Sequence, residues 1–419
     1  MVRSRASGGA GLGSVVAGLL AMMVVSCSTP PETATGKDYA RALPDGAPAL
    51  VRVTDPAEFP DMKAAWDDRD ATLAALDESL AYFAKPSSQL WFPYKTADRE
   101  IAHAEQVQTL EALRAILVAS EGAGDFQAWC SLAFDYYRSA GWDGGGEVLF
   151  TAYCEPIFEG RLEPDATFRY PLYKLPPDLV KDEHGKPLGR RTESGEVVPY
   201  HARGELEQQG LLDGLELVYL KDPFEVYIAH VQGSARIDLP NGTQMCVGYA
   251  GKTDRPYVSI GRRLVAEGHI KSENLSLVRL RRYFREQPSE LTRVLPVNES
   301  YVFFLERGPG PFGSLGCRVT PYHTVATDKA VFPRGGPVVV VSRLPVEAPL
   351  GNAGPGKAGV RYANRTCLAF DQDTGGGIRS AGRADLFIGT GPEAERLAGY
   401  TQEEGRLFYF FIKKRPVLP

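Results

Sequence analysis

The 419-residue sequence predicts a mainly β protein with helices near its N-terminal end, for three reasons. Glycine and proline are frequent, with 44 and 31 residues, which favours turn-rich β structure over a helical bundle. Before residue 148, apolar residues recur at helical spacing. From Val148 onwards, short alternating stretches are interrupted by Gly, Pro and Asn-Gly, a pattern typical of strands joined by turns.

The first 26 residues have the pattern of a lipoprotein signal peptide. Arg3 and Arg5 form a basic start, and Leu12 to Val25 form an apolar run that is too short to span a bilayer. Val24-Val25-Ser26-Cys27 then resembles a lipobox, which predicts cleavage before Cys27 and lipidation of that cysteine. The alternative is an ordinary export signal that ends beside a free cysteine.

The residues after the predicted cleavage site indicate where the protein is held. Ser28, in place of Asp, favours the periplasmic face of the outer membrane, with the membrane contacted through the lipid on Cys27. Residues 27–50 are rich in Pro, Thr, Ala and Gly and are expected to form a flexible tether.

A helical region is expected over residues 51–147. The first helix ends before Pro86, and its apolar residues lie at helical spacing: Trp66, Leu73, Leu76, Leu80 and Phe83. A second helix contains Leu110 to Leu117, and a third is predicted from Phe126 to Ala140, with Gly141 as its stop. Farther along the chain, Asn241-Gly242 between two strand-like stretches predicts a β-hairpin.

Composition and motifs exclude several classes of function. The net charge of −5 and the pI near 5.8 argue against a nucleic-acid partner, which would require a basic face. The cysteines after Cys27 show no CxxC pairing, so neither a metal site nor a cofactor is expected. Gly308 to Gly313 matches the dinucleotide fingerprint, but its two prolines remove N–H donors that a pyrophosphate needs.

Three aspartates near the C-terminal end are the candidate catalytic residues: Asp328, Asp373 and Asp385. Asp385 stands between Ala384 and Leu386-Phe387, and we expect apolar neighbours to favour its protonated form, as a general acid requires. Asp373 is followed by Thr374 and three glycines and is expected to stay ionised. Two carboxyls in different environments are typical of acid/base work on a glycosidic bond. Alternatively, Asp373 to Gly376 is only a tight turn.

The order of several motifs resembles one known family. The run from Asn298 to Lys414, with its three aspartates, resembles the 3D domain, which is named for them. Ala229 to Ile237, Gly248 to Gly251 and Pro256 to Arg262 resemble the insert domain of the membrane-bound lytic murein transglycosylase A family. The resemblance covers roughly Val148 to Lys414.

This resemblance implies a fold and a division into domains. Family members fold as a double-psi β-barrel that is discontinuous in sequence and carries an inserted second β domain. Here the barrel would comprise residues 148–160 and 297–419, and the insert residues 161–296. A groove between the two domains would hold a glycan strand.

The resemblance also assigns site residues. Asp385 corresponds to the single catalytic acid, and Gln232 to Ser234 correspond to a sugar-binding strand of the insert. The residues expected to bind or support the substrate are Asp373, Asp328, Thr374, Gly375, Gly376, Gln232, Gly233, Ser234, Tyr153 and Glu155. The chain departs from the family pattern at Ala235 and at His323-Thr324, which puts the substrate preference in doubt.

The activity that the resemblance implies is that of a peptidoglycan lytic exotransglycosylase, a lyase. Asp385 would act first as acid and then as base, breaking the β-1,4 bond between N-acetylmuramic acid (MurNAc) and N-acetylglucosamine (GlcNAc) and leaving 1,6-anhydro-MurNAc ends. The residues alone do not separate exo from endo action. Two alternatives remain, namely a glycan hydrolase of the same fold and a non-catalytic peptidoglycan-binding lipoprotein.

Overall fold

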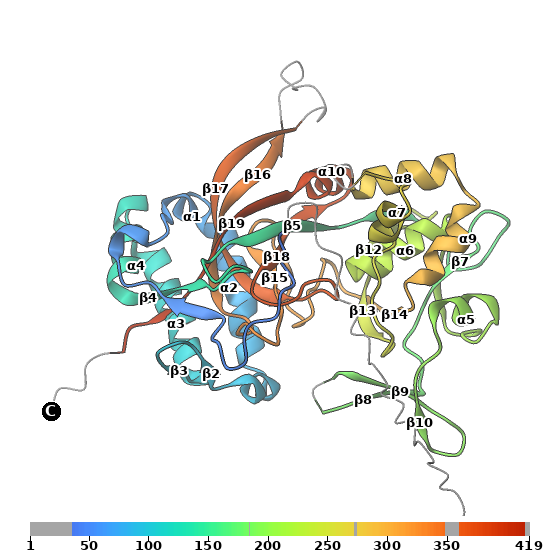
Figure 1. Ribbon diagram of the computed structural model, residues 1–419, viewed down its shortest axis with the longest axis horizontal. Coiled ribbons are helices and arrows are strands. Elements are labelled where there is room, and N and C mark those ends of the chain that lie inside the picture. The colour runs from blue at the N-terminus through green and yellow to red at the C-terminus, as the bar shows by residue number, and fades with distance from the viewer. Residues whose placement is uncertain (1–35, 184, 272–274, 348–359, 415–419) are drawn as a thin grey trace, which may run out of the picture.

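The computed structural model describes residues 36–183, 185–271, 275–347 and 360–414 (Figure 1). The predicted signal peptide and Cys27 lie outside these residues. Within the described ranges, no helix has the length and apolar character needed to cross a membrane.

Six strands close into a β-barrel at the centre of the molecule (Figure 1). They are β5 (Val148–Glu155), β15 (Thr324–Ala326), β16 (Pro337–Glu347), β17 (Val360–Asp373), β18 (Arg383–Thr390) and β19 (Gln402–Ile412). The ring runs β19–β16–β17–β15–β18–β5 and returns to β19. Strands β5 and β18 pair in parallel, as do β15 and β17, and the other neighbours are antiparallel. The prediction of a mainly β protein is therefore confirmed.

Both faces of the barrel strands are buried, because side chains alternate between the barrel interior and the helices outside. Val338 and Val340 of β16 belong to the interior core, whereas Val339 between them packs with Phe370 and Phe410 against the helices. Outside the ring, β1 (Leu50–Arg52) pairs with β4 (Phe134–Ser139), and β4 pairs with β19. The helix α10 (Pro392–Tyr400) connects β18 to β19.

The N-terminal helices cover one side of the barrel (Figure 1). They are α1 (Lys63–Asp67), α2 (Arg69–Phe83), α3 (His103–Ala119) and α4 (Ala123–Ala133), with η1 (Pro56–Glu58), η2 (Pro86–Trp91), β2 (Tyr94–Lys95) and β3 (Glu100–Ile101) between them. The predicted third helix is too long, because Phe134–Ser139 forms β4 instead. Tyr136 and Tyr137 of β4 bury their side chains on opposite faces, which the pairing with β19 makes favourable.

The N-terminal segment Lys37–Leu50 is docked on the barrel, so the predicted flexible tether is wrong for these residues. The Lys37 Nζ lies 2.6 Å from a carboxylate oxygen of Glu404 in β19, and the Tyr39 hydroxyl donates to the same carboxylate. Leu43 packs against the interior core of the barrel, and Leu50 is buried in β1.

A second β unit, the insert, lies on the other side of the barrel (Figure 1). Its main sheet contains β6 (Ile157–Glu159), β12 (Ser234–Asp238), β13 (Gln244–Lys252) and β14 (Val302–Arg307). The pairing of β12 with β13 confirms the hairpin at Asn241-Gly242. Strands β6 and β14 were expected within the barrel, so the insert extends beyond the predicted limits of 161 and 296 at both ends.

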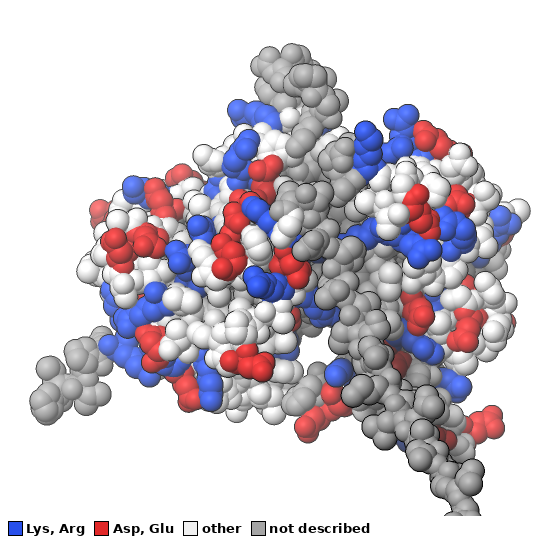
Figure 2. Space-filling view, viewed as in Figure 1, with Lys and Arg blue, Asp and Glu red and all other residues white. Residues whose placement is uncertain are grey.

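Helices and small sheets complete the insert. The helices are α5 (Arg203–Gln208), α6 (Pro223–Gln232), α7 (Ile260–Ala266), α8 (Leu277–Glu286), α9 (Glu290–Val294) and η4 (Leu295–Val297). The small sheets contain β7 (Tyr170–Tyr173) with β11 (Glu216–Leu220), and β8 (Leu179–Lys181) with β9 (Pro187–Arg191) and β10 (Val197–Val198). Figure 2 shows both signs of charge intermixed over the barrel and the insert on the viewed face.

We predict that Glu225 makes the stability of the protein depend on pH. Burial in α6, with Asp222 nearby, raises the pKa of Glu225 to about 7, and its Oε2 has no hydrogen-bond partner. Because the folded protein then holds a proton that the unfolded chain releases from about pH 4.5, stability falls as pH rises from about 4.5 to 7. Glu225→Gln should raise the free energy of unfolding at pH 8 by roughly 1–2 kcal/mol after screening by solvent.

Chemical denaturation of both proteins at pH 8 and pH 4.5 measures this effect. The difference should become small at pH 4.5, where the glutamate is protonated in the folded protein and about half protonated in the unfolded chain. Glu163→Gln, at an exposed position of the insert, is the matched control and should change little at either pH. An equal gain at both pH values would rule out the titration of Glu225 as the cause.

Candidate active site

Asp385 projects from β18 on the outer face of the barrel, where two polar side chains hold its carboxylate. Thr151 of β5 is its register partner, and the Thr151 hydroxyl donates to Asp385 Oδ1. Arg383 Nε lies 3.2 Å from the same oxygen, and Arg383 Nη2 donates to the Thr151 hydroxyl over 3.1 Å. Both side chains of the ion pair are mostly buried, at 23% and 17% exposure.

The expectation that Asp385 has apolar surroundings is wrong. Ala384 and Leu386 belong to the interior core of the barrel, so they point away from the Asp385 side chain. Arg383, two residues before Asp385, lies on the same face of the strand. The residues adjacent in sequence therefore do not desolvate this carboxyl, and a cation contacts it.

Asp373 is the last residue of β17, and β15 lies between β17 and β18 in the barrel. Ala326 of β15 is the register partner of Asp373 on one side and of Asp385 on the other. Two strand spacings place the two aspartate Cα atoms about 10 Å apart. The backbone N–H groups of Ser314 and Thr374 each donate to Asp373 Oδ1 over 2.8 Å.

The surroundings of Asp373 are contrary to the expectation that it stays readily ionised. Burial raises the pKa of Asp373, and the donors from Ser314 and Thr374 only partly oppose that effect. The burial comes in part from Gly313, where an added Cβ would lie 3.1 Å from the Asp373 Cβ. The turn interpretation of this motif also holds, because the Thr374 N–H bonds the Asp373 side chain.

Asp328 fixes a loop and does not present a free carboxylate. Its Oδ2 accepts the N–H of Ser380 over 2.7 Å, and its Oδ1 accepts the N–H of Ala330 over 3.0 Å. The Thr374 hydroxyl donates to the Thr327 carbonyl over 2.7 Å, which holds the same loop from its other end. Asp328 therefore orders the glycine loop between β17 and β18.

The glycine loop packs against the insert. A Cβ at Gly376 would lie 3.6 Å from the Cβ of Tyr257, whereas at Gly375 it would lie 3.1 Å from Ile378 within the loop. Tyr257 was not predicted as a site residue. The absence of a side chain at these glycines allows the loop to approach the insert closely.

Tyr153 and Asp385 lie in the same barrel, because their strands β5 and β18 are paired neighbours. The Tyr153 hydroxyl is buried beside the Asp373 carboxyl, and burial together with that carboxyl raises the pKa of the tyrosine. Its ring packs on that of Phe387, with centroids 5.2 Å apart. The Tyr153 hydroxyl therefore belongs to the immediate surroundings of Asp373.

Glu155 joins the barrel to the insert and was wrongly expected to face an open cleft. Its side chain is 1% exposed. Glu155 Oε2 accepts from Arg236 Nη2 of β12 and from the Thr390 hydroxyl of β18, both over 3.0 Å. Glu155 is thus the buried acid of an ion pair across the junction of the two units.

The predicted sugar-binding strand from Gln232 to Ser234 is not a strand throughout. Gln232 is the last residue of α6, Gly233 ends that helix with a φ of 75°, and Ser234 begins β12. The N–H of Cys154 in β5 donates to Gln232 Oε1 over 3.4 Å, so Gln232 lies against the barrel.

The two departures from the family pattern lie in the cores, not at the carboxylates. Ala235 is fully buried in the core of the insert. His323 Nδ1 lies 3.4 Å from the Thr72 hydroxyl of α2 and 2.8 Å from the Leu368 carbonyl oxygen. The Thr324 hydroxyl donates to Gln372 Oε1 over 2.7 Å. Neither departure contacts the aspartates of the site, so their effect is on packing.

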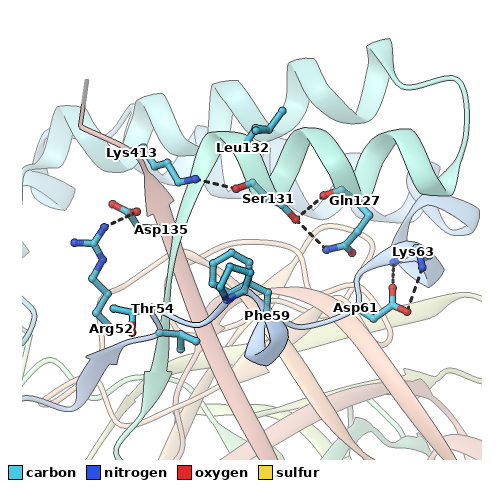
Figure 3. A pocket seen from close by; sticks show the side chains of 12 residues that line it. Arg52, Thr54, Phe59, Asp61, Lys63, Gln127, Ser131, Leu132, Asp135 and Lys413 are labelled. Carbon is cyan, nitrogen blue, oxygen red and sulfur yellow. Dashed lines mark hydrogen bonds and ion pairs between the residues drawn. The ribbon is translucent and has the colours of Figure 1, made fainter. Parts of the chain in front are cut away.

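A hollow of about 700 Å³ lies elsewhere, between the N-terminal segments and the end of β19 (Figure 3). Its charged side chains have partners: Arg52 is 2.8 Å from Asp135, and Lys413 donates to the Ser131 carbonyl over 2.8 Å. None of the site aspartates lines it.

Thr151 is a positioning residue that the sequence analysis missed. It stands two residues before Tyr153, so both project from the same face of β5. We predict that Thr151→Val lowers kcat for glycan cleavage about 10- to 100-fold, because a hydrogen bond to a charged group contributes about 1.5–3 kcal/mol. Steady-state rates on cell-wall glycan measure the loss. Thr390→Val, which removes a donor from Glu155 instead, is the control and should leave kcat nearly unchanged.

Comparison with known proteins places this two-part β structure in a defined class. Residues 149–305 match the family model of the MltA specific insert domain, and residues 323–411 match that of the 3D domain. The membrane-bound lytic murein transglycosylase A of Vibrio cholerae is 32% identical over 299 residues, covering 70% of this chain and 73% of the relative. The Escherichia coli K12 protein of that name is 30% identical over 288 residues, covering 68% and 71%.

Solved structures share the fold. The membrane-bound lytic murein transglycosylase from Agrobacterium tumefaciens has a TM-score of 0.68 at 24% identity, covering 87% of this chain and 98% of that chain. Neisseria gonorrhoeae MltA has a TM-score of 0.59 at 27% identity, covering 91% and 100%. Escherichia coli MltA with bound chitohexaose has a TM-score of 0.61 at 24% identity, covering 93% and 100%.

These matches confirm the resemblance found in the sequence. A chain with both the insert domain and the 3D domain falls in a class of cell-wall enzymes. It belongs to the membrane-bound lytic murein transglycosylase A family.

Proposed function

We propose that this protein is a lytic transglycosylase that cleaves the β-1,4 bond between MurNAc and GlcNAc in peptidoglycan. The observation that carries the proposal is Asp385, held by Thr151 and Arg383 on the barrel surface of a chain that belongs to this family. The carboxylate sits on a paired strand, and such rigid elements give a catalytic group a defined position.

The reaction uses one carboxyl twice. Asp385 in its protonated form donates to the glycosidic oxygen as the bond to C1 breaks. The resulting carboxylate then takes the proton from the muramyl C6 hydroxyl, whose oxygen closes on C1 and gives a 1,6-anhydro ring. Attack from within the same sugar needs no bound water and has a high effective concentration. Arg383 and Thr151 stabilise the carboxylate that exists between the two proton transfers.

Asp373 and Tyr153 assist this step. An ionised Asp373 about 10 Å away across the strands stabilises positive charge that develops at C1. The Tyr153 hydroxyl, which lies beside the Asp373 carboxyl, contacts the sugar. Gln232 and Ser234, at the junction with the insert, contact acetamido and hydroxyl groups. The binding of chitohexaose by Escherichia coli MltA supports a glycan as the ligand.

The proposal includes the topology and the location of the protein. Six barrel strands with parallel pairs β5–β18 and β15–β17 support a double-psi arrangement, formed by sequence on both sides of the insert. The lipobox supports a lipid anchor at Cys27 on the periplasmic face of the outer membrane. The relatives are named membrane-bound, which supports attachment to a membrane.

Mass spectrometry of the products released from purified cell-wall sacculi tests the function. Anhydro ends, which lack the mass of one water, are the expected result. Products that carry an added water would instead identify a hydrolase of the same fold. Binding without any released product would identify a non-catalytic peptidoglycan-binding lipoprotein.

A further inference from the structure

A buried ion pair inside the barrel lies directly behind the proposed site. The Asp371 side chain is 0% exposed and the Lys329 side chain 5% exposed, and the Lys329 ammonium contacts Asp371 Oδ1. Asp371 Oδ2 accepts hydroxyl donors from Thr327 and Tyr409, both over 2.7 Å. Both carboxylate oxygens are therefore partnered, by Tyr409 of β19 and by Thr327 and Lys329 in the segment that follows β15.

The pair is connected to Asp373 through the backbone of Thr327. Lys329 Nζ also donates to the Thr327 hydroxyl over 3.1 Å and to the Asp371 carbonyl over 3.3 Å. The Thr327 N–H donates to the Asp373 carbonyl over 3.2 Å, and the Thr327 carbonyl accepts the Thr374 hydroxyl over 2.7 Å. The pair therefore holds Thr327, in the segment after β15, against the end of β17.

We propose that Lys329 and Asp371 form a positioning pair for glycan cleavage, which fixes the Asp373 carboxyl and places a positive charge behind it. This inference rests on the proposed function. A misplacement of about 1 Å in a catalytic group can lower the rate about 100-fold, so a clamp at this point affects kcat. The pair lies in the barrel interior, so it does not contact the glycan and has little effect on KM.

The charge of Lys329 has its own consequence. Burial raises the pKa of Asp373, and Lys329 acts in the opposite direction by stabilising the carboxylate. The other titratable and charged groups around the pair and Asp373 are Tyr153, Tyr409, Tyr94, Arg334 and Cys317. Removal of the cation raises the pKa of Asp373. If the reaction needs ionised Asp373, the acidic limb of the kcat profile moves to higher pH.

The test compares variants on soluble glycan strands prepared from sacculi. Lys329→Met alone leaves the buried Asp371 carboxylate without its cation and should lower the midpoint temperature of thermal unfolding. Lys329→Met with Asp371→Asn removes both charges and keeps a carbonyl oxygen for the Thr327 and Tyr409 hydroxyls, so it should regain most of that midpoint. We expect this double variant to show a kcat lowered about 10- to 100-fold and an unchanged KM. The acidic limb should move to higher pH in Lys329→Met alone, because the double variant loses an anion together with the cation.

Two further variants make the outcome decisive. Lys329→Arg keeps the cation and should retain the wild-type acidic limb. Tyr409→Phe keeps both charges but removes one hydrogen-bond donor to Asp371, so it serves as the test if the double variant fails to fold. Its kcat should fall several-fold at constant KM.

A folded double variant with wild-type kcat would overturn the positioning role. So would an unchanged kcat in Tyr409→Phe where the double variant does not fold. A wild-type protein that releases no product overturns the proposed function as well, which distinguishes the two failures.

Discussion

Replacing Asp385 with Asn should abolish the release of anhydro products from sacculi while the fold is kept. Asparagine has nearly the same shape, but it cannot donate the proton to the leaving oxygen or accept one from the C6 hydroxyl. Loss of general acid/base catalysis typically lowers the rate about 10²–10⁴-fold, and one group serves both steps here, so we expect the upper end. Quantitative mass spectrometry of the released muropeptides measures the loss.

Asp328→Asn and Asp373→Asn are the matched comparisons for this variant. Asp328 accepts only backbone N–H groups, so its replacement should lower kcat less and act mainly on the loop at Ser380. Asp373→Asn should also lower kcat less than Asp385→Asn does, because Asp373 acts through its charge alone. Near-wild-type turnover in Asp385→Asn would remove this residue from the mechanism.

Replacing Arg236 with Met should produce the largest loss of stability among single changes at the junction of barrel and insert. It leaves Glu155 in a 1% exposed position with only the Thr390 hydroxyl as donor. Removal of one partner from a buried pair typically destabilises a protein by 3–5 kcal/mol, and Arg236 is 26% exposed, so we expect about 3 kcal/mol. Chemical denaturation at pH 7 measures the difference.

The double variant Glu155→Gln with Arg236→Met separates an unpaired charge from lost packing. It removes the uncompensated carboxylate, so most of the stability should return. Arg282→Met, which breaks an exposed pair with Glu286 on α8, is the control and should change the stability little. Equal losses in the single and double variants at the junction would show that the Arg236 side chain stabilises by packing.

The sequence predicted the fold class and the aspartates, but it misjudged their environments for a physical reason. Ala384 and Leu386 are adjacent to Asp385 in the chain and face the opposite side of the strand. The groups that do contact Asp385 are Thr151, more than two hundred residues away, and Arg383, two residues back. Alternation along a strand would have identified Arg383, whereas no local pattern shows which strand lies alongside.

Two local errors have different origins. The helix before Gln232 carries its own signals, since Asp222 accepts the Phe224 N–H, Pro223 follows at the first position and Gly233 ends the helix. Those signals were present in the sequence and were outweighed by the resemblance. By contrast, β4 follows α4 without a turn signal, and its pairing with β19 depends on residues near the C-terminal end. Tertiary contacts decide such a segment, and its own composition does not.

The docking of Lys37–Leu50 sets a working distance for the enzyme. With Cys27 held in a membrane, only residues 28–36 would separate the lipid from the first anchored side chain, a reach of about 35 Å when fully extended. A tether that continued to Leu50 would reach about 80 Å. In a protein anchored in that way, the shorter reach would confine cleavage to the layer of cell wall nearest the membrane, and the salt bridge between Lys37 and Glu404 would help to decide which glycan strands the protein can meet.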